Sequence, residues 1–349
     1  MVATMRQVAA AAGVSIATAS RALSGSDAVV AATKQRVLQV AAELDYTPSR
    51  LARGLVTGST GNVGVIVPDV TNPFFAPFLA ELEAALGEHD VGLLMGNSQE
   101  SREHEHRLVR RMSTQVDGLV LASSRLSDEQ IVHATGQLPV VLANRQIAGT
   151  PSPDDRLRQV VIDVRPGFRA AVAHLHSLGH RGLTYVDGPS RSWSAAQKRT
   201  ALEDACTALG LALTVVRGER PDFSAGRSVG GLILGGGATA VLAYNDQVAL
   251  GLLSACRDAG VEVPARMSVV GCDDALPEGM ASPALTTIDC SSRTLGVLAA
   301  AAILQPAERE PAAVPSRLVV RASTGPADSE ADAADAAGPP RPSRTEELA

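Results

Sequence analysis

The chain has 349 residues, 45% of them apolar and 19% charged, the composition of a globular protein with room for two or three domains. No apolar run is long enough to span a bilayer, and residues 1–6 lack the apolar stretch of a secretory signal. We therefore expect a cytoplasmic protein with no membrane partner. The four cysteines form no C-x-x-C pair, and we expect reduced, buried thiols.

Charge is unevenly distributed along the sequence. Residues 1–60 hold six Lys and Arg against three Asp and Glu, a net charge of +3 that leaves −9 for the rest of a total of −6. A small basic head on an acidic body is typical of a nucleic-acid-binding module joined to another domain. Charge alone does not exclude a chance distribution.

The first residues predict two short helices separated by a tight turn. Thr4 begins the first helix in a capping box with Gln7, and Gly13 supplies the backbone freedom that a turn needs. Ser15 caps a second helix over residues 16–23. Its predicted inward side chains are Val14, Ala19 and Leu23, and its outward ones are Ile16, Ala17, Ser20 and Arg21.

A third predicted helix, residues 31–44, supports these two and begins weakly because Val30 cannot cap it. Its expected buried side chains are Val37, Val40, Ala41 and Leu44. A helix, a glycine turn, a short helix and a supporting helix form a helix-turn-helix, although other three-helix bundles share that pattern. A short basic helix within residues 46–55 then precedes a loop at residues 57–61.

With this segment the chain resembles the lactose-repressor and purine-repressor family (LacI/GalR type) over residues 3–324. The residues that carry this resemblance are Val8-Ala9, Ala12-Gly13-Val14-Ser15, Thr18, Ser20-Arg21, residues 42–49 and Leu51-Ala52-Arg53. The resemblance implies that the second helix enters the major groove of operator DNA and that Leu55 is a minor-groove wedge. The DNA-binding residues it implies are Thr4, Ser15, Ile16, Ala17, Thr18, Ser20, Arg21, Ser24, Arg50, Arg53 and Leu55.

These residues differ in what they can recognise. Arg21 can donate two hydrogen bonds to guanine, whereas Thr18 and Ser20 suit phosphates, which carry no sequence information. Ile16 can at most contact a thymine methyl, and core packing is its alternative. Gly54 costs the short basic helix about 1 kcal/mol relative to Ala, so we expect that helix to fold only on DNA.

From residue 62 onward, apolar strands alternate with amphipathic helices. Such a series predicts parallel sheets covered by helices on both faces. One series begins at residues 63–67 and a second at residues 160–162, which predicts two doubly wound subdomains, the sugar-binding (periplasmic-binding-protein-like) body of the family. By the resemblance, the segment around residues 318–320 returns to the first lobe.

Ligands of doubly wound sheets bind at the carboxyl ends of the strands, here the cleft between the lobes. Polar and aromatic side chains at successive strand ends suit a polyhydroxylated ligand. The predicted effector-binding residues are Asn72, Phe74, Arg145, Trp193, Lys198, Phe223, Asn245 and Asp273. Helix capping is the alternative for Asn72 and Asn245, and core packing for Phe223. Lys198 stands where the family commonly has Arg, and Arg199 could take that role if the register differs by one.

Two histidine pairs, His104/His106 and His174/His176, have i, i+2 spacing, which places the partners on different faces of a helix. We expect no metal and no cofactor, and no catalytic constellation marks an enzyme. The expected domains are a helix-turn-helix (1–47), a hinge and linker (48–60), a two-lobed ligand-binding and dimerisation domain (61–324) and a disordered tail (325–349).

The sequence therefore predicts a homodimeric, DNA-binding repressor controlled by a small polar effector such as a sugar. A sugar-binding protein without a DNA role and a nucleoside- or purine-sensing repressor are the alternatives. The predicted partners are double-stranded operator DNA and the effector.

Overall fold

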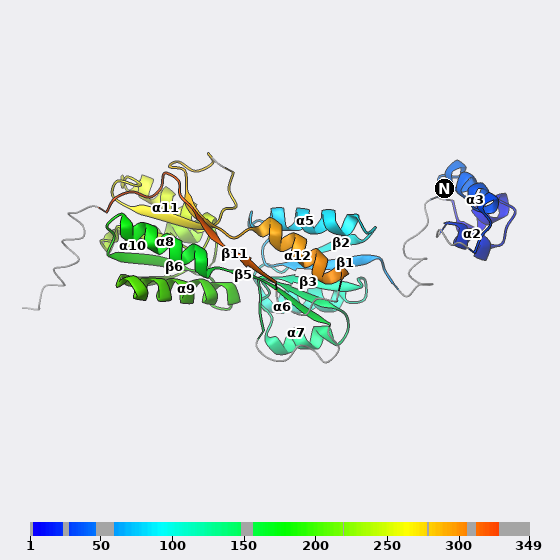
Figure 1. The fold of residues 1–349 in the computed structure, drawn as a ribbon, viewed down its shortest axis with the longest axis horizontal. Helices are drawn as coiled ribbons and strands as arrows, with labels where there is room; N and C mark the ends of the chain where they lie inside the picture. Colours follow the sequence, from blue (N-terminus) through cyan, green and yellow to red (C-terminus); the bar gives the residue numbers. More distant parts are fainter. Residues whose placement is uncertain are drawn as a thin grey trace, which may run out of the picture. The chain divides into compact units, whose positions relative to one another are not determined.

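The computed structural model describes residues 3–23, 28–46, 59–147, 156–218, 220–277, 279–305 and 312–327. The chain divides into two compact units, one up to Gly61 and one from Asn62 onward. We call the first the head and the second the body (Figure 1). No helix within the described residues is both long and apolar enough to cross a membrane.

The head contains the three predicted helices, α1 (Met5–Ala11), α2 (Ile16–Leu23) and α3 (Ala31–Glu43). The capping box of Thr4 and Gln7 is confirmed, and Gly13 has the positive φ of 64° expected of the turn. Val30 precedes α3 without a side-chain cap, also as predicted.

A small core joins the three helices, formed by Val8, Ala9, Ala12, Ala19, Ala22, Val37 and Ala41. Burial of Leu44 was a wrong prediction. That side chain is 38% exposed, because α3 ends one residue before it.

The body consists of two lobes, each built on a six-stranded sheet. The first-lobe sheet has the order β11-β5-β4-β3-β1-β2, and every pairing in it is parallel. Its strands are β1 (Asn62–Val67), β2 (Gly92–Asn97), β3 (Gly118–Ala122), β4 (Val140–Ala143), β5 (Leu157–Asp163) and β11 (Ala312–Pro315). Its helices are α5 (Phe75–Gly87), α6 (Arg102–Met112), α7 (Asp128–Thr135) and α12 (Ser292–Leu304).

The second-lobe sheet has the order β12-β10-β9-β8-β6-β7 and is parallel except for its edge strand β12. Its strands are β6 (Gly182–Asp187), β7 (Ala212–Arg217), β8 (Ala240–Ala243), β9 (Ser268–Asp273), β10 (Thr286–Asp289) and β12 (Arg317–Val319). Its helices are α8 (Arg165–Ser177), α9 (Trp193–Leu209), α10 (Phe223–Gly235) and α11 (Asp246–Asp258).

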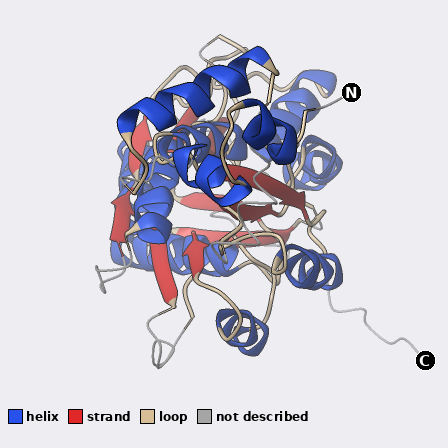
Figure 2. Ribbon diagram, turned by 90° about the vertical axis from the view of Figure 1, so that its right-hand side faces the viewer, coloured by secondary structure: helices blue, strands red, loops and turns tan. Residues whose placement is uncertain are grey.

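Helices cover both faces of each sheet, as the continuous apolar strands predicted (Figure 2). In the first lobe, Phe78 of α5 and Leu295 of α12 pack on one face, and Val109 of α6 and Ile131 of α7 pack on the other. Such double coverage leaves the carboxyl ends of the strands as the open edge where polar side chains can gather.

The chain crosses between the lobes at different places from those predicted. The strand at residues 160–162 belongs to β5 of the first lobe and does not begin the second. Residues 318–319 belong to β12, which pairs with β10 of the second lobe. The segment that returns to the first lobe consists instead of α12 and β11 (Figure 1). A hydrophobic pattern predicts that a segment is a strand but not which sheet the strand joins. The predictions for residues 160–162 and 318–320 were therefore wrong in strand pairing.

Candidate functional site

The outward face of α2 carries the side chains predicted to read DNA. Ile16 is 49% exposed, so the core-packing alternative does not hold. Ala17 and Arg21 are exposed as well, and Ala19 lies on the opposite, buried face. An exposed arginine on the second helix of a helix-turn-helix can reach base edges.

The hydroxyls of α2 are held in place by its N-terminal cap. Ser15 Oγ accepts a hydrogen bond from the Thr18 backbone N–H at 3.1 Å, and the two hydroxyls lie 2.8 Å apart. Both side chains are at least partly exposed, which leaves room for contacts with phosphate. Thr4 caps α1 in the same manner. Ser20 of α2 is partly exposed, and the other predicted DNA contacts, Ser24, Arg50, Arg53 and Leu55, lie outside the described residues.

The second predicted site is a cavity between the two lobes of the body that opens to solvent, with about 350 Å³ of empty space if its open mouth is included. Asn72, Phe74 and Asn144 line it from the first lobe, and Lys198, Tyr244 and Asp273 line it from the second. Asn144 and Tyr244 directly follow strands and Asp273 ends one, whereas Asn72 and Phe74 lie in the loop between β1 and α5, all on the carboxyl side of their strands. The cavity therefore brings together groups that lie up to 201 residues apart in the sequence.

A buried ion pair forms the second-lobe wall of this cavity. Lys198 Nζ lies 3.1 Å from Asp273 Oδ1 and donates a hydrogen bond of 2.9 Å to the Tyr244 backbone carbonyl. The ammonium also stands 4.4 Å from the centre of the Tyr244 ring, a cation–π contact. Burial is the largest single influence and disfavours the charged lysine, but the Asp273 carboxylate together with Cys272, Cys290 and Tyr244 outweighs burial and raises the pKa of Lys198.

The cation of the first-lobe wall is paired too. Arg125, also in the lining, is 4% exposed, lies 2.7 Å from Glu100 and donates a hydrogen bond to the Ser123 backbone carbonyl. Asn144 donates from Nδ2 to Ser123 Oγ at 3.2 Å. Its Oδ1 is buried and has no hydrogen-bond partner within the described part of the chain. An unpartnered buried acceptor in a cavity wall suits a ligand that donates a hydrogen bond.

The structure brings four of the eight predicted effector residues, Asn72, Phe74, Lys198 and Asp273, into the cavity lining. Asn72 does not cap α5, since its Oδ1 accepts from the Phe74 backbone N–H within a turn. Arg199, the alternative to Lys198, pairs with Asp187 instead.

The other four, Arg145, Trp193, Phe223 and Asn245, are absent from the lining. Arg145 pairs with Asp128 at 2.5 Å, and Phe223 begins α10 with 41% of its surface exposed. Asn245 caps α11 by accepting from the Val248 backbone N–H at 2.9 Å, and its Nδ2 donates to the Pro221 carbonyl. Its side chain is thereby occupied as the capping alternative describes.

Sequence analysis did not place Glu100, Arg125, Asn144 or Tyr244 among the effector residues. Asn144 and Tyr244 directly follow β4 and β8, so the strand-end signal that selected their neighbours could also have found them. Arg125 stands three residues beyond β3, and only the folded loop turns it back toward the cavity.

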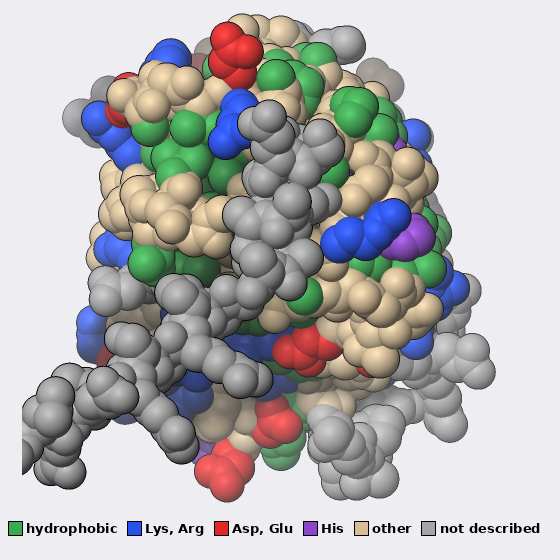
Figure 3. Space-filling view, turned by 90° about the vertical axis from the view of Figure 1, so that its left-hand side faces the viewer, with side chains coloured by type: hydrophobic (Ala, Val, Ile, Leu, Met, Phe, Trp, Pro, Cys, Tyr) green, Lys and Arg blue, Asp and Glu red, His purple; other side chains and the backbone are tan. Residues whose placement is uncertain are grey.

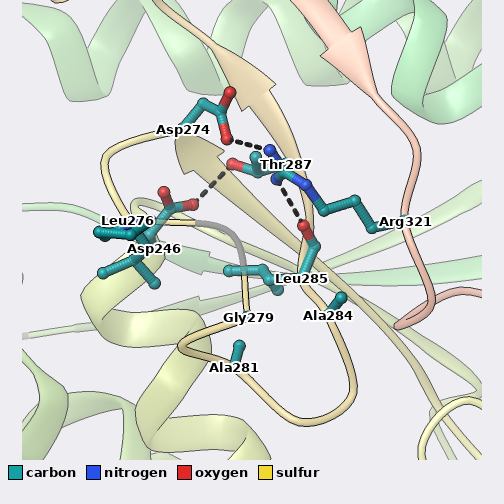
Figure 4. Close-up of a pocket in the computed structure, with 10 residues that line it drawn as sticks. Asp246, Asp274, Leu276, Gly279, Ala281, Ala284, Leu285, Thr287 and Arg321 are labelled. Carbon is teal, nitrogen blue, oxygen red and sulfur yellow. Dashed lines mark hydrogen bonds and ion pairs between the residues drawn. The ribbon is translucent and has the colours of Figure 1, made fainter.

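A second, open cavity, with about 270 Å³ of empty space if its mouth is included, lies within the second lobe beside the loop after β9 (Figure 4). The carboxylate of Asp246 accepts hydrogen bonds from Thr287 Oγ1 at 2.6 Å and from the Ala275 backbone N–H at 2.8 Å. Burial, with help from the nearby Asp273 charge, raises the pKa of Asp246 to about 7. Arg321 pairs with Asp274 at 2.7 Å on the same loop.

Lys, Arg, Asp and Glu side chains are interspersed over the end face of the second lobe (Figure 3). A nucleic-acid-binding surface instead gathers positive charge on one face. The described residues visible on this end of the body therefore show mixed charge and not the concentration of positive charge that the sequence assigns to the head.

Two family descriptions match the chain. Residues 4–49 match "Bacterial regulatory proteins, lacI family", and residues 172–324 match "Periplasmic binding protein-like domain". The HTH-type transcriptional regulator GalS of Salmonella typhimurium is 32% identical over 308 residues, which cover 86% of this chain and 89% of the relative.

Solved structures agree with these matches. The lac repressor dimer bound to operator and the anti-inducer ONPF has a TM-score of 0.82 at 26% identity, covering 93% of this chain and all of that one. A complex of the transcriptional regulator CelR with cellobiose has a TM-score of 0.67 at 27% identity, covering 92% of this chain and 99% of that one.

Proposed function

Because this chain belongs to the LacI family of bacterial regulatory proteins and is therefore a DNA-binding transcriptional regulator, we propose that it is a repressor controlled by an uncharged, polyhydroxylated effector of the sugar class. The effector binds between the lobes and changes the affinity of the head for operator DNA. The relatives reported above are regulators, which supports a role without catalysis.

The main support for an uncharged effector is that the charged side chains of the cavity are already paired with one another. Lys198 and Arg125 each face a carboxylate of the protein itself, so an anionic ligand would have to break a buried ion pair, which is costly. A hydroxyl group, in contrast, can supply the hydrogen-bond donor that the buried Asn144 Oδ1 lacks among the described residues. Phe74 and Tyr244 offer apolar surface against which a sugar ring can pack. The CelR complex with cellobiose supports the same class.

For DNA, we propose a homodimer that binds a near-palindromic operator through α2 of each subunit. A single head of three short helices makes too few contacts for tight, specific binding, and two-fold proteins read two-fold sites. The lac repressor structure, a dimer on its operator, supports this arrangement. The segment at residues 48–60 would then link each head to its body.

The test combines operator binding with an effector screen. Full-length protein should shift the DNA upstream of its own operon in a gel, and one or more neutral sugars should change that shift and raise the melting temperature. Nucleosides and sugar acids serve as the comparison sets. If only a sugar acid or only a nucleoside acts, the effector class is wrong, and if no DNA is shifted, the regulatory proposal fails.

Matched variants locate the effector site. Asp273→Asn and Asn144→Asp change groups that line the cavity and should each weaken the effector response at least tenfold, the equivalent of about 1.4 kcal/mol. Phe223→Ala and Arg145→Ala are the controls, because neither residue lines the cavity and both side chains are at least partly exposed. Loss of response in the controls alone would move the site away from the cavity.

A further inference from the structure

Two buried cysteines lie close to the carboxylate of Asp273, which forms part of the second-lobe wall of the cavity. Cys272 lies in β9 and Cys290 directly follows β10, the neighbouring parallel strand. Their Sγ atoms are 3.6 Å apart, and both side chains are almost completely buried. These sulfurs and a carboxylate oxygen of Asp273 all lie within 4.8 Å of one another. The sequence predicted only reduced, buried thiols, because the cysteines form no C-x-x-C pair.

The distance between the two sulfurs can be compared with that in a disulfide and with that between two thiolates bound to one metal ion. A disulfide holds its sulfurs about 2.05 Å apart, so bonding would require the strands or side chains to close by well over 1 Å. Two thiolates that share one tetrahedral Zn²⁺, each about 2.3 Å from the ion, lie about 3.8 Å apart. The observed spacing of 3.6 Å is close to this second value.

We propose that Cys272, Asp273 and Cys290 form a binding site for a thiophilic d¹⁰ cation of the Zn²⁺ and Cd²⁺ class. Two sulfurs and one carboxylate oxygen are a donor set that these ions accept, whereas Mg²⁺ and Ca²⁺ prefer oxygen donors alone. Three protein ligands leave the fourth tetrahedral position to water, which can enter from the cavity that Asp273 lines. On binding, both thiols lose their protons to solvent and become thiolates.

The ammonium group of Lys198 places a positive charge beside this cluster. Its ammonium lies 3.1 Å from the Asp273 carboxylate that the cation would take as a ligand. The cation and the ammonium therefore compete for one carboxylate, and binding requires the lysine to swing toward the cavity. This competition predicts that removal of the ammonium strengthens metal binding, a response that a merely structural pair of thiols would not give.

The experiment uses full-length, reduced protein titrated with Cd²⁺ alone. One equivalent should bind and produce the thiolate-to-metal charge-transfer absorbance, and calorimetry with Zn²⁺ should give the same stoichiometry. Cys272→Ser and Cys290→Ser should each weaken binding about 100-fold or more, since loss of an outer-shell partner alone costs 10- to 100-fold. The double variant Cys206→Ser, Cys256→Ser is the matched control, because its cysteines are also buried but lie on α9 and α11.

Lys198→Met provides the second arm, with an expected affinity at least tenfold higher than that of the wild type. Absence of the band from the wild-type protein at excess Cd²⁺ would overturn the proposal, as would unchanged binding in both single serine variants. Should the variants fail to fold, alkylation of the wild type decides: bound Cd²⁺ must protect Cys272 and Cys290 more than the two control cysteines. Equal protection of all four would also refute the site.

Discussion

The buried carboxyl group of Asp246 should have a measurable effect on the free energy of unfolding. Replacement of its carboxyl by an amide in Asp246→Asn keeps the shape of the side chain and removes its charge. The amide can still accept from Thr287, but its nitrogen cannot accept from the Ala275 backbone N–H. That loss should lower the free energy of unfolding by about 1–3 kcal/mol, to a similar extent at every pH.

The charge produces a different, pH-dependent effect. An unfolded Asp has a pKa of about 3.9, whereas burial raises the pKa of folded Asp246 to about 7. The folded state therefore holds the proton more tightly, and its stability falls as pH rises from about 4 to about 7 and then levels off. Over the two units between pH 5 and pH 7, at about 1.4 kcal/mol per unit, the wild type should lose about 3 kcal/mol through this group.

Urea unfolding of the full-length wild type and of Asp246→Asn at pH 5 and pH 8 tests this, with a chelator present so that no metal ion contributes. The wild type should lose about 3 kcal/mol more than the variant between the two pH values, because every other titrating group is common to both. If the two proteins change in parallel, Asp246 is ionised throughout and the reasoning from burial is wrong.

Three further substitutions test other parts of the structure. Arg21→Ala should cost about 1–3 kcal/mol on operator DNA and little on random DNA in filter binding, and equal losses would mark a phosphate contact. Lys198→Met should destabilise the protein by about 3–5 kcal/mol in urea unfolding, with at least half recovered when Asp273→Asn is added; no recovery would contradict the pairing. Gly251→Ala should destabilise by at least about 1–3 kcal/mol because its Cβ would lie 2.2 Å from a backbone oxygen of α10, whereas Gly231→Ala meets open space and should not destabilise.

The sequence predicted correctly those features that depend on residues close together in the chain, such as helix caps. The box of Thr4 and Gln7 and the cap that Ser15 gives to α2 depend on residues three apart, and both are observed. The exposed face of α2 follows from helical periodicity in the same way. Two parallel-sheet lobes were also predictable, because continuous apolar strands separated by helices admit few other arrangements.

Pairing across the chain was not predictable to the same degree. The apolar pattern of β5 suits either sheet, and its place beside β4 is decided by crossovers that no local pattern records. The cavity shows the same limit, since the helix cap at Asn245 and the wall at Asp273 both follow strands and look alike in sequence. Only the fold separates a strand-end residue that faces a ligand from one that starts the next helix.

The crossovers that were misplaced in the sequence-based prediction are also the connections through which the proposed effector would act. Ser316, between β11 of the first lobe and β12 of the second, accepts a hydrogen bond from the Gly167 backbone N–H at 3.0 Å and donates one to the Asp163 carbonyl at 2.8 Å. One hydroxyl thus ties two of the segments that pass between the lobes. Because the proposed effector cavity is lined from both lobes, a ligand that binds one lobe arrangement more tightly would shift the equilibrium between arrangements at these crossings. Since β1 begins directly after the head in the chain and belongs to the first lobe, we propose that a rearrangement of the lobes reaches the head through this connection.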